Sequence, residues 1–263
     1  MSTSRGWGER HLLRASKAIL LDWDGCVAIN NRILSGAAAL IAQHVDRVMI
    51  VSNNSTHLPE DFAELLQQSG LAVPPERIFM AGVEAVRHVA MLGAARVMLL
   101  STPRIKRFAR DLGVNLVRDN PDIVLLMRDA RFTYTKLERI ANAVRDGARL
   151  VVANADLTHP GPAGRLVPET GALLAALLAC VGEQPTMHVL GKPGPWLFRR
   201  ACACLNVAPQ QAVMIGDNPE TDGLGAHRFG MRSIIVGGET GLRIEDLIEP
   251  AIPQPVRALL RSA

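Results

Sequence analysis

The chain has 263 residues, enough for one large domain or two modest ones with a sizeable buried core. Its formal net charge is +4 and its basic residues are scattered, which argues against a nucleic-acid-binding protein. No apolar run reaches membrane-spanning length, and the N-terminus lacks the apolar segment of a secretory signal, so we expect a cytoplasmic protein with no membrane partner.

Predicted strands and helices alternate along most of the chain, as is typical of a parallel α/β sheet. Residues 1–14 form an arm that we expect to be loosely ordered. The first strand, residues 18–21, is apolar throughout and ends in two carboxylates and a glycine. The other expected strands are residues 48–51, 78–80, 96–100, 123–127, 150–154, 187–190, 212–215 and 233–236. The expected helices start at Ser35 and Pro59 and cover about residues 103–112, 135–147, 171–180 and 195–205.

Polar side chains follow four of these strands. In an open parallel sheet, ligands bind at the carboxyl ends of the strands, so we expect these side chains to gather along one edge. Asp22 and Asp24 follow the first strand and, two residues apart on an extended chain, point the same way. Held close together, two carboxylates need a cation, or a division of labour in which one stays ionised and the other carries a proton. The remaining residues are Ser52, Asn53, Asn54, Lys192, Asp217 and Asp222.

This set of groups suits phosphoryl transfer to a carboxylate. Mg²⁺ prefers carboxylate and carbonyl oxygens, and it would screen the nucleophile from a dianionic phosphate. Lys192 and Ser52 would hold the non-bridging oxygens. Each piece by itself is also common in turns, and Ser52-Asn53-Asn54 equally suits a helix cap. The prediction therefore rests on the order of the pieces, each of which follows an apolar strand.

Four segments carry this order: Asp22-Trp23-Asp24-Gly25, Ser52-Asn53-Asn54, Gly191-Lys192-Pro193 and Gly216-Asp217-Asn218-Pro219-Glu220-Thr221-Asp222. Together they resemble the four motifs of the haloacid dehalogenase superfamily. The resemblance is closer to its NagD-like, class IIA phosphatases, the group that includes 4-nitrophenyl-, nucleotide- and pyridoxal-phosphate phosphatases. It extends over about residues 17 to 247 and includes segments similar to that group's cap, at residues 132–137, 153–156 and 168–172.

The resemblance implies the catalytic roles. Asp22 would be the nucleophile that becomes an aspartyl-phosphate. Asp24 would be the general acid, which protonates the leaving oxygen and then activates water, and its main-chain carbonyl would face Mg²⁺. Lys192 would steady the nucleophile and the phosphate. The residues of the metal site would be Asp22, Asp24 and Asp217, supported from behind by Asp222 and Asn218.

The resemblance also implies substrate-binding residues. Ser52 would bind the phosphate, with Asn53 and Asn54 beside it. His159 lies in a Pro/Gly-rich loop, residues 159–164, where some relatives touch their substrate. A surface histidine without a role in binding is the alternative interpretation of His159.

Three positions depart from the family pattern, and none of them removes a catalytic group. Gly223 follows Asp222 where an apolar residue is common, and the sequence leaves the roles of the other two departures open. Cys26 stands where Thr or Val is usual, and either packing or reactivity would explain a thiol beside the carboxylates. Met127-Arg128 replaces the more usual Val-Gly pair before the cap-like segment at residues 132–137. Because the cap is where substrate specificity lies, Arg128 and the loop of His159 leave the substrate undetermined.

The spacing of the motifs places an inserted domain. Between the first and second motifs there is room for about one strand–helix unit, whereas the segment between the second and third far exceeds one crossover. We therefore expect a Rossmann-like doubly wound core from residues 15–82 and 184–263, and an α/β cap from residues 83–183, of the C2 type by resemblance. A cap over the strand ends would exclude water and choose the leaving group. The sequence does not fix the oligomer, although relatives often form homodimers through their caps.

These observations predict a Mg²⁺-dependent phosphatase that hydrolyses a small organic phosphomonoester through an aspartyl-phosphate. A receiver-like phospho-acceptor module would need the acceptor aspartate and Mg²⁺ but has no use for a cap. A metal-independent dehalogenase would need neither the second carboxylate nor a metal. A non-catalytic sugar- or nucleotide-binding domain would keep clustered carboxylates at a cost and leave them unused. The expected partner is a small phosphorylated metabolite that the sequence does not name.

Overall fold

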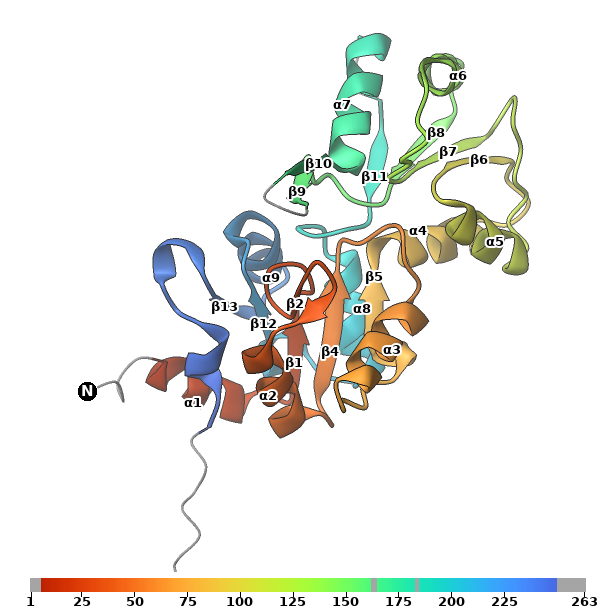
Figure 1. Cartoon of the computed structure of the whole chain (residues 1–263). Coiled ribbons are helices and arrows are strands. Elements are labelled where there is room, and N and C mark those ends of the chain that lie inside the picture. The colour runs from red at the N-terminus through yellow and green to blue at the C-terminus, as the bar shows by residue number, and fades with distance from the viewer. Residues whose placement is uncertain (1–5, 162–164, 183–184, 250–263) are drawn as a thin grey trace, which may run out of the picture.

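Two parallel sheets organise the computed structural model, which describes residues 6–161, 165–182 and 185–249 (Figure 1). The core sheet has the order β13 (Arg232–Ile235), β12 (Ala212–Gly216), β1 (Ala18–Leu21), β4 (Val48–Ser52) and β5 (Ile78–Met80). The second sheet has the order β11 (Met187–Val189), β8 (Arg149–Val152), β7 (Ile123–Leu126) and β6 (Val97–Leu100). Every pairing within these two sheets is parallel. The predicted α/β class, a parallel core with a second α/β unit inserted in it, is confirmed.

Helices flank both sheets. The α-helices are α1 (Trp7–Ala15), α2 (Ser35–His44), α3 (Pro59–Gln68), α4 (Ala81–Ala90), α5 (Pro103–Asp111), α6 (Tyr134–Arg145), α7 (Thr170–Val181), α8 (Trp196–Cys204) and α9 (Leu224–Arg228). Short helical turns of other types cover Pro75–Arg77, Pro209–Gln211, Pro219–Gly223, Gly238–Thr240 and Ile244–Leu247. Within the described residues, none of the helices has both the length and the hydropathy that crossing a bilayer requires.

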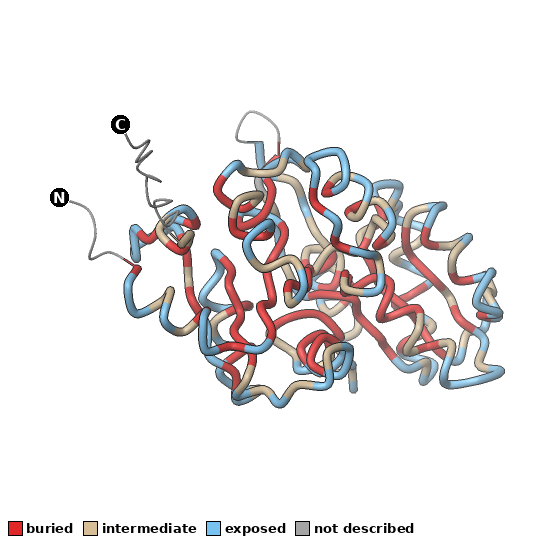
Figure 2. Tube along the Cα trace, turned by 90° about the horizontal axis from the view of Figure 1, so that it is seen from below, coloured by how far each residue is buried: buried red, intermediate tan, exposed pale blue. Residues whose placement is uncertain are grey.

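The central strands of the core sheet bury side chains on both faces. Ile19 and Leu21 of β1 pack on one face, in a cluster that includes residues of α2 and α3. Leu20 packs on the opposite face, in a cluster that includes residues of α4 and α8. Because helices cover both faces, the strands are continuous apolar runs rather than alternating ones. Figure 2 shows the buried segments in the middle of the molecule and the exposed segments around it.

The second sheet also packs on two sides. Leu126 and Val152 face α6 and α7 in a cluster of their own. Leu125 and Val151 point the other way and belong to the same apolar cluster as the core residues of α4 and α8. The two sheets therefore share one continuous cluster, and the inserted unit is seated on the core rather than tethered beside it. Figure 1 shows this unit next to the carboxyl ends of β1 and β4.

The strand that leads to Lys192 belongs to the second sheet. β11 pairs with β8, with His188 opposite Val151. The prediction placed this strand in the core, and on that point it is wrong. A strand of three residues carries too little pattern to say which of two sheets it joins. The predicted boundary itself, residues 183 and 184, lies outside the described residues.

The N-terminal segment is helical instead of loosely ordered. α1 covers Trp7–Ala15, and its Leu13 is fully buried against the core. The Arg47 side chain donates a hydrogen bond to the Leu13 carbonyl at 2.9 Å, which fixes the end of the helix. The prediction of a loosely ordered arm is therefore wrong for residues 7–14. The sequence does not show what a single leucine will pack against, because that contact forms only in the folded chain. Residues 1–5 lie outside the described residues.

Two short hairpins also went unpredicted. The first joins β2 (Ala28–Ile29) to β3 (Arg32–Ile33), directly after the first motif. Asn30 and Asn31 form its turn with positive φ angles of 50° and 58°, the conformation that two-residue hairpin turns require. The second joins β9 (Thr158–Pro160) to β10 (Leu166–Pro168), and the predicted Pro/Gly-rich loop, residues 159–164, overlaps β9 and the connection between the two strands. Residues 162–164 of that loop lie outside the described residues.

Candidate active site

A buried lysine joins two of the predicted carboxylates. Asp22 directly follows β1, and its N–H donates to the Ile215 carbonyl at 2.9 Å, so the pairing with β12 holds it at the sheet edge. The Lys192 ammonium donates to Asp22 Oδ1 at 2.5 Å and to Asp222 Oδ1 at 2.7 Å. The Lys192 side chain is only 2% exposed, so these charge-assisted bonds replace the water it has lost.

Burial governs the electrostatics of this cluster. It raises the pKa of Asp22 well above its usual range. The positive charge of Lys192 lowers this pKa, and the negative charge of Asp222 raises it further. Burial alone would lower the pKa of Lys192, but the two carboxylates more than offset it, so the ammonium stays charged.

Asp217 brings a third carboxylate to the same place. Oxygen atoms of Asp22, Asp217 and Asp222 all lie within 4.8 Å of one another. Burial raises the pKa of Asp217, and the charge of Asp222 raises it further. Gly25 makes the approach of Asp217 possible, because a Cβ at Gly25 would lie 2.2 Å from Asp217 Oδ2. Three carboxylates and one ammonium leave negative charge that a divalent cation would balance.

The donors of this cluster fit a hard cation such as Mg²⁺, which prefers carboxylate oxygens. Asp222 has both oxygens engaged, since Oδ1 accepts from Lys192 and Oδ2 accepts the Asn218 N–H at 3.2 Å. Asp22 and Asp217 are therefore the carboxylates that remain available to an ion. Asp222 and Asn218, which the sequence predicts to support the metal site, are joined to each other by the hydrogen bond from the Asn218 N–H.

Asp24 lies apart from the carboxylate cluster and is exposed to solvent. Its pKa is nevertheless raised, because the surrounding protein removes part of its hydration, and the nearby charges of His159 and Lys192 oppose the rise. A group that water can reach but only partly hydrate holds its proton to higher pH than a free aspartic acid. That state suits a general acid.

Ser52 ends β4 and is buried to 1% exposure. Its Oγ accepts the Asn54 N–H at 3.0 Å, so the hydroxyl proton is left to donate elsewhere. The Asn54 side chain accepts the N–H groups of Thr56 and His57 at 2.9 and 3.0 Å. Asn54 thus shapes the turn after β4, which matches the alternative interpretation of this segment as a cap with a turn.

Asn53 contacts the main chain of Lys192. Its Oδ1 accepts the Lys192 N–H at 2.7 Å, and its Nδ2 donates to the Lys192 carbonyl at 3.1 Å. The same Nδ2 lies 3.1 Å from both carboxylate oxygens of Asp156, a cap residue that the prediction did not include among the site residues. With these contacts, Asn53 is engaged in holding other groups of the protein.

His159 lies on β9 and faces a charged group of the cap. Its Nδ1 is 2.7 Å from Glu169 Oε1, and Arg128 Nη1 is 3.3 Å from the same oxygen. His159 and Arg128 both oppose the rise in the pKa of Asp24, so this group of cap residues lies on the side of the cap that faces Asp24. Glu169 was missed by the prediction, although it lies in one of the segments that resemble the family cap.

Cys26 is buried beside the site, and its Sγ lies 3.6 Å from the Ile215 carbonyl. Burial raises the pKa of the thiol well above its usual range, and the charge of Asp22 adds to the rise. A thiol kept protonated is a poor nucleophile, which favours the packing role over the reactive one.

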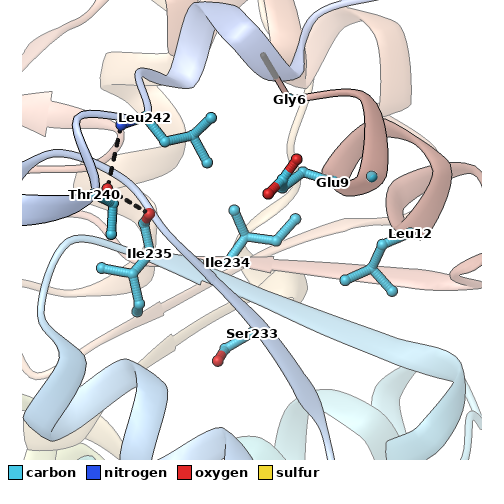
Figure 3. Close-up of a pocket in the computed structure, with 9 residues that line it drawn as sticks. Gly6, Glu9, Leu12, Ser233, Ile234, Ile235, Thr240 and Leu242 are labelled. Atoms are coloured by element: carbon cyan, nitrogen blue, oxygen red, sulfur yellow. Dashed lines mark hydrogen bonds between the residues drawn. The ribbon is translucent and has the colours of Figure 1, made fainter. Parts of the chain in front are cut away.

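A separate pocket of about 440 Å³ lies between α1 and β13, away from these residues (Figure 3). Its lining includes the carboxylate of Glu9, the apolar side chain of Ile234 and the hydroxyl of Thr240. Thr240 donates to the Ile235 carbonyl at 3.1 Å and is thereby used in closing its own turn. The pocket contains none of the predicted catalytic residues.

Similarity to known proteins agrees with this geometry. Residues 19–115 match the haloacid dehalogenase-like hydrolase family, and residues 189–259 match the HAD-hydrolase-like family. Chronophin of Rattus norvegicus is 31% identical to this chain over 247 residues, which cover 88% of this chain and 79% of that protein.

Two solved structures are similar to this one. NagD from E. coli K-12 aligns with a TM-score of 0.75 at 23% sequence identity. The alignment covers 84% of this chain and 88% of NagD, and it shows that the two proteins share a fold. A glycerol phosphate phosphatase from Mycobacterium tuberculosis, in complex with magnesium, has a TM-score of 0.78 at 27% identity and covers 93% of this chain with 82% of its own. This chain therefore belongs to the haloacid dehalogenase-like hydrolases and, within them, to the NagD-like class IIA phosphatases.

Proposed function

We propose that this phosphatase depends on Mg²⁺ and hydrolyses a small organic phosphomonoester through an aspartyl-phosphate on Asp22. The observation that carries the proposal is the distance of at most 4.8 Å between oxygens of Asp22 and Asp217, beside an ammonium that already holds Asp22. The same ion could meet both carboxylates. Asp22, Asp217 and the main-chain carbonyl of Asp24 would hold the ion, which would screen the nucleophile from the phosphate.

The first half of the reaction uses the two acids of the first motif. Lys192 holds Oδ1 of Asp22, so Oδ2 is the oxygen that attacks phosphorus. As that bond forms, the bond from phosphorus to the ester oxygen breaks, and Asp24 gives its proton to the departing oxygen. Ser52 donates a hydrogen bond from its hydroxyl group to a non-bridging oxygen, and Lys192 offers positive charge beside it.

The second half returns the enzyme to its starting state. Asp24, now ionised, takes a proton from a water molecule as that water attacks phosphorus. The bond between phosphorus and Asp22 breaks, inorganic phosphate leaves, and Asp24 is again protonated. The raised pKa of Asp24 supports both steps, because the group must give and regain one proton near neutral pH.

The cap supports a polar leaving group. Arg128, Glu169 and His159 form a charged group on the catalytic side of the cap, and such groups bind hydroxyls better than they bind bare hydrocarbon. The glycerol phosphate phosphatase that resembles this chain acts on a hydroxylated substrate by its name. We therefore propose that the substrate is a small phosphorylated metabolite with a hydroxylated leaving group. We also propose a cytoplasmic location, as expected from the sequence, and a homodimer that forms through the cap.

A phosphate-release screen tests the proposed function. The panel would include glycerol phosphate, sugar phosphates, nucleoside monophosphates, pyridoxal phosphate and 4-nitrophenyl phosphate, each with Mg²⁺ and with EDTA. We expect release with Mg²⁺, loss with EDTA and recovery when Mg²⁺ is added in excess. Halide release without Mg²⁺, or a stable phosphorylated Asp22 without turnover, would contradict the proposal in favour of a dehalogenase or a receiver-like module.

A further inference from the structure

The Asn53 side chain connects the catalytic lysine to the cap. On one side it brackets the main chain of Lys192, accepting the N–H at 2.7 Å and donating to the carbonyl at 3.1 Å. On the other side its amide group lies 3.1 Å from each oxygen of the Asp156 carboxylate. Asn53 follows core strand β4, and Asp156 follows cap strand β8. One amide thus spans the junction between the two units.

The surroundings hold this amide in one orientation. The Asn154 side chain donates to the Asn53 carbonyl at 2.8 Å, which ties the backbone of Asn53 to the cap. The Gly191 N–H donates to the Ala153 carbonyl at 2.7 Å, and a Cβ at Gly191 would lie 2.6 Å from Asn53 Oδ1. The loop before Lys192 is therefore pressed between the end of β8 and the Asn53 side chain.

Asp156 is itself placed by neighbouring cap residues. Its N–H donates to Asn154 Oδ1 at 3.2 Å, and its carbonyl accepts the Gly171 N–H at 2.8 Å at the start of α7. A hydrogen bond from an amide to a charged carboxylate is stronger than one to a neutral group. The carboxylate therefore orients the Asn53 amide group, and the amide in turn orients the lysine loop.

We propose that Asp156 is a positioning residue, which acts through Asn53 to set the place of Lys192 and so links the seating of the cap to the readiness of the catalytic lysine. The expected effect on kcat rests on the proposed phosphatase function, whereas the positioning of Lys192 does not. When the cap is seated, Asp156 locks the Asn53 side chain and the lysine loop is held. When the cap lifts, Asn53 loses this carboxylate and holds the loop less firmly.

The kinetic test compares Asp156→Ala with a matched cap variant, Asp122→Ala. Asp122 is also a cap carboxylate, and it accepts the Arg96 main-chain N–H at 2.7 Å, but it lies outside the site. We expect Asp156→Ala to lower kcat by about tenfold to a hundredfold, because a displaced catalytic group costs rate rather than binding. We expect KM to change little, Asp156→Asn to recover part of the rate, and Asp122→Ala to match the wild type.

A double-mutant cycle tests the route through Asn53. If Asp156 acts through Asn53, the double variant Asn53→Ala with Asp156→Ala loses no more kcat than Asn53→Ala alone. The pair Asn53→Ala with Asp122→Ala serves as the independent control. The proposal would be overturned if the losses in kcat of Asn53→Ala and Asp156→Ala multiplied in the double variant. It would also be overturned if Asp156→Ala raised KM and left kcat unchanged.

A measurement without catalysis separates this inference from the proposed function. Amide hydrogen exchange of the segment of residues 187–194 reports how firmly the lysine loop is held. We expect Asp156→Ala to speed this exchange by about tenfold and Asp122→Ala to leave it unchanged. Unchanged exchange in Asp156→Ala would overturn the positioning role in an active enzyme. Faster exchange in Asp156→Ala, together with a wild-type chain that releases no phosphate, would uphold the positioning role and reject the proposed function.

Discussion

One oxygen of Asp22 is bound by Lys192, whereas no hydrogen bond within the described residues reaches the other. The two oxygens of the Asp22 carboxylate are therefore not equivalent. Lys192 is in turn shared with Asp222, so two carboxylates hold its ammonium in place. In the proposed mechanism, the residue that attacks, Asp22, is thus distinct from the residues that hold it.

The first prediction concerns the nucleophile. Asp22→Asn should lower phosphate release by on the order of a thousandfold or more, because an amide oxygen does not form the acyl phosphate. The asparagine is nearly the same size and keeps an oxygen for Lys192, so the circular dichroism spectrum should not change. Appreciable turnover in the folded variant would exclude the covalent mechanism.

The second prediction concerns the pH dependence of the general acid. Asp24 must be protonated to give its proton to the leaving oxygen, so kcat/KM for an alkyl phosphate should fall as the pH rises through the raised pKa of Asp24. Asp24→Asn should slow turnover strongly, remove this limb of the profile and leave substrate binding intact. With 4-nitrophenyl phosphate, whose leaving group needs no proton, the limb should be weaker. A profile that is the same in both proteins would refute the acid role.

Turns and short hairpins control the site at the scale of elements. Directly after β1, Gly25 adopts a φ of +86° and leaves room for Asp217, which arrives from the end of β12. The β2–β3 hairpin follows at once, and its Asn31 accepts a hydrogen bond from the Trp23 ring at 3.1 Å. The turn after β1 thus leaves room for Asp217, the proposed metal-site carboxylate, on one side and is closed by the hairpin on the other.

The third prediction tests this turn. Gly25→Ala should raise the Mg²⁺ concentration for half-maximal activity by roughly tenfold or more, because the new methyl group displaces Asp217. Gly70→Ala is the matched control, since Gly70 has a similar φ of +77° but no atom within 4 Å of the added Cβ. Calorimetric titration with Mg²⁺ would check the affinity directly. If the two variants bound Mg²⁺ with equal affinity, any change from the wild type would come from backbone strain and not from displacement of Asp217.

At the scale of the whole molecule, the cap is attached to the core on two sides. Arg104 of α5 forms an ion pair with Asp61 of α3 on one side. Asn53 and Asp156 meet on the other, above the catalytic edge. Between them runs the continuous apolar cluster that the two sheets share. The cluster of Asp22, Asp217 and Asp222 therefore lies where the two units join, and its net negative charge affects the stability of the whole chain.

The fourth prediction follows from that charge. Mg²⁺ binding to the folded state alone should raise the unfolding temperature, with about 2.7 kcal/mol of stabilisation at a hundredfold excess over its dissociation constant. Asp217→Asn should lose most of this gain and should not destabilise the metal-free protein, because it removes one of three mutually repelling carboxylates. Thermal unfolding with Mg²⁺, and with NaCl at equal ionic strength, would check both. A wild-type Mg²⁺ shift retained in Asp217→Asn would remove Asp217 from the metal site.

Local sequence pattern was sufficient for the parts of the fold that depend on neighbours in the chain. The apolar runs before Asp22, Ser52 and Asp217 mark strands buried on both faces, and the polar residue after each run marks the strand end. Since parallel strands end at one edge, the sequence predicted that Asp22, Asp217 and Asp222 lie along that edge, and the pairing of β1 with β12 in the structure brings carboxylate oxygens of all three within 4.8 Å of one another. The spacing between motifs likewise predicted an inserted unit, because one crossover cannot consume so many residues.

Tertiary structure decided what depends on residues far apart in the chain. That β11 joins β8, that Leu13 makes α1 a packed helix, and that Asn53 reaches Asp156 all rest on contacts across the fold. No local period encodes such contacts, because a short strand, a lone leucine or a single amide has the same neighbours in the chain wherever it finally packs. Strand ends are properties of a segment, whereas the partners of an exposed polar group are properties of the assembled surface.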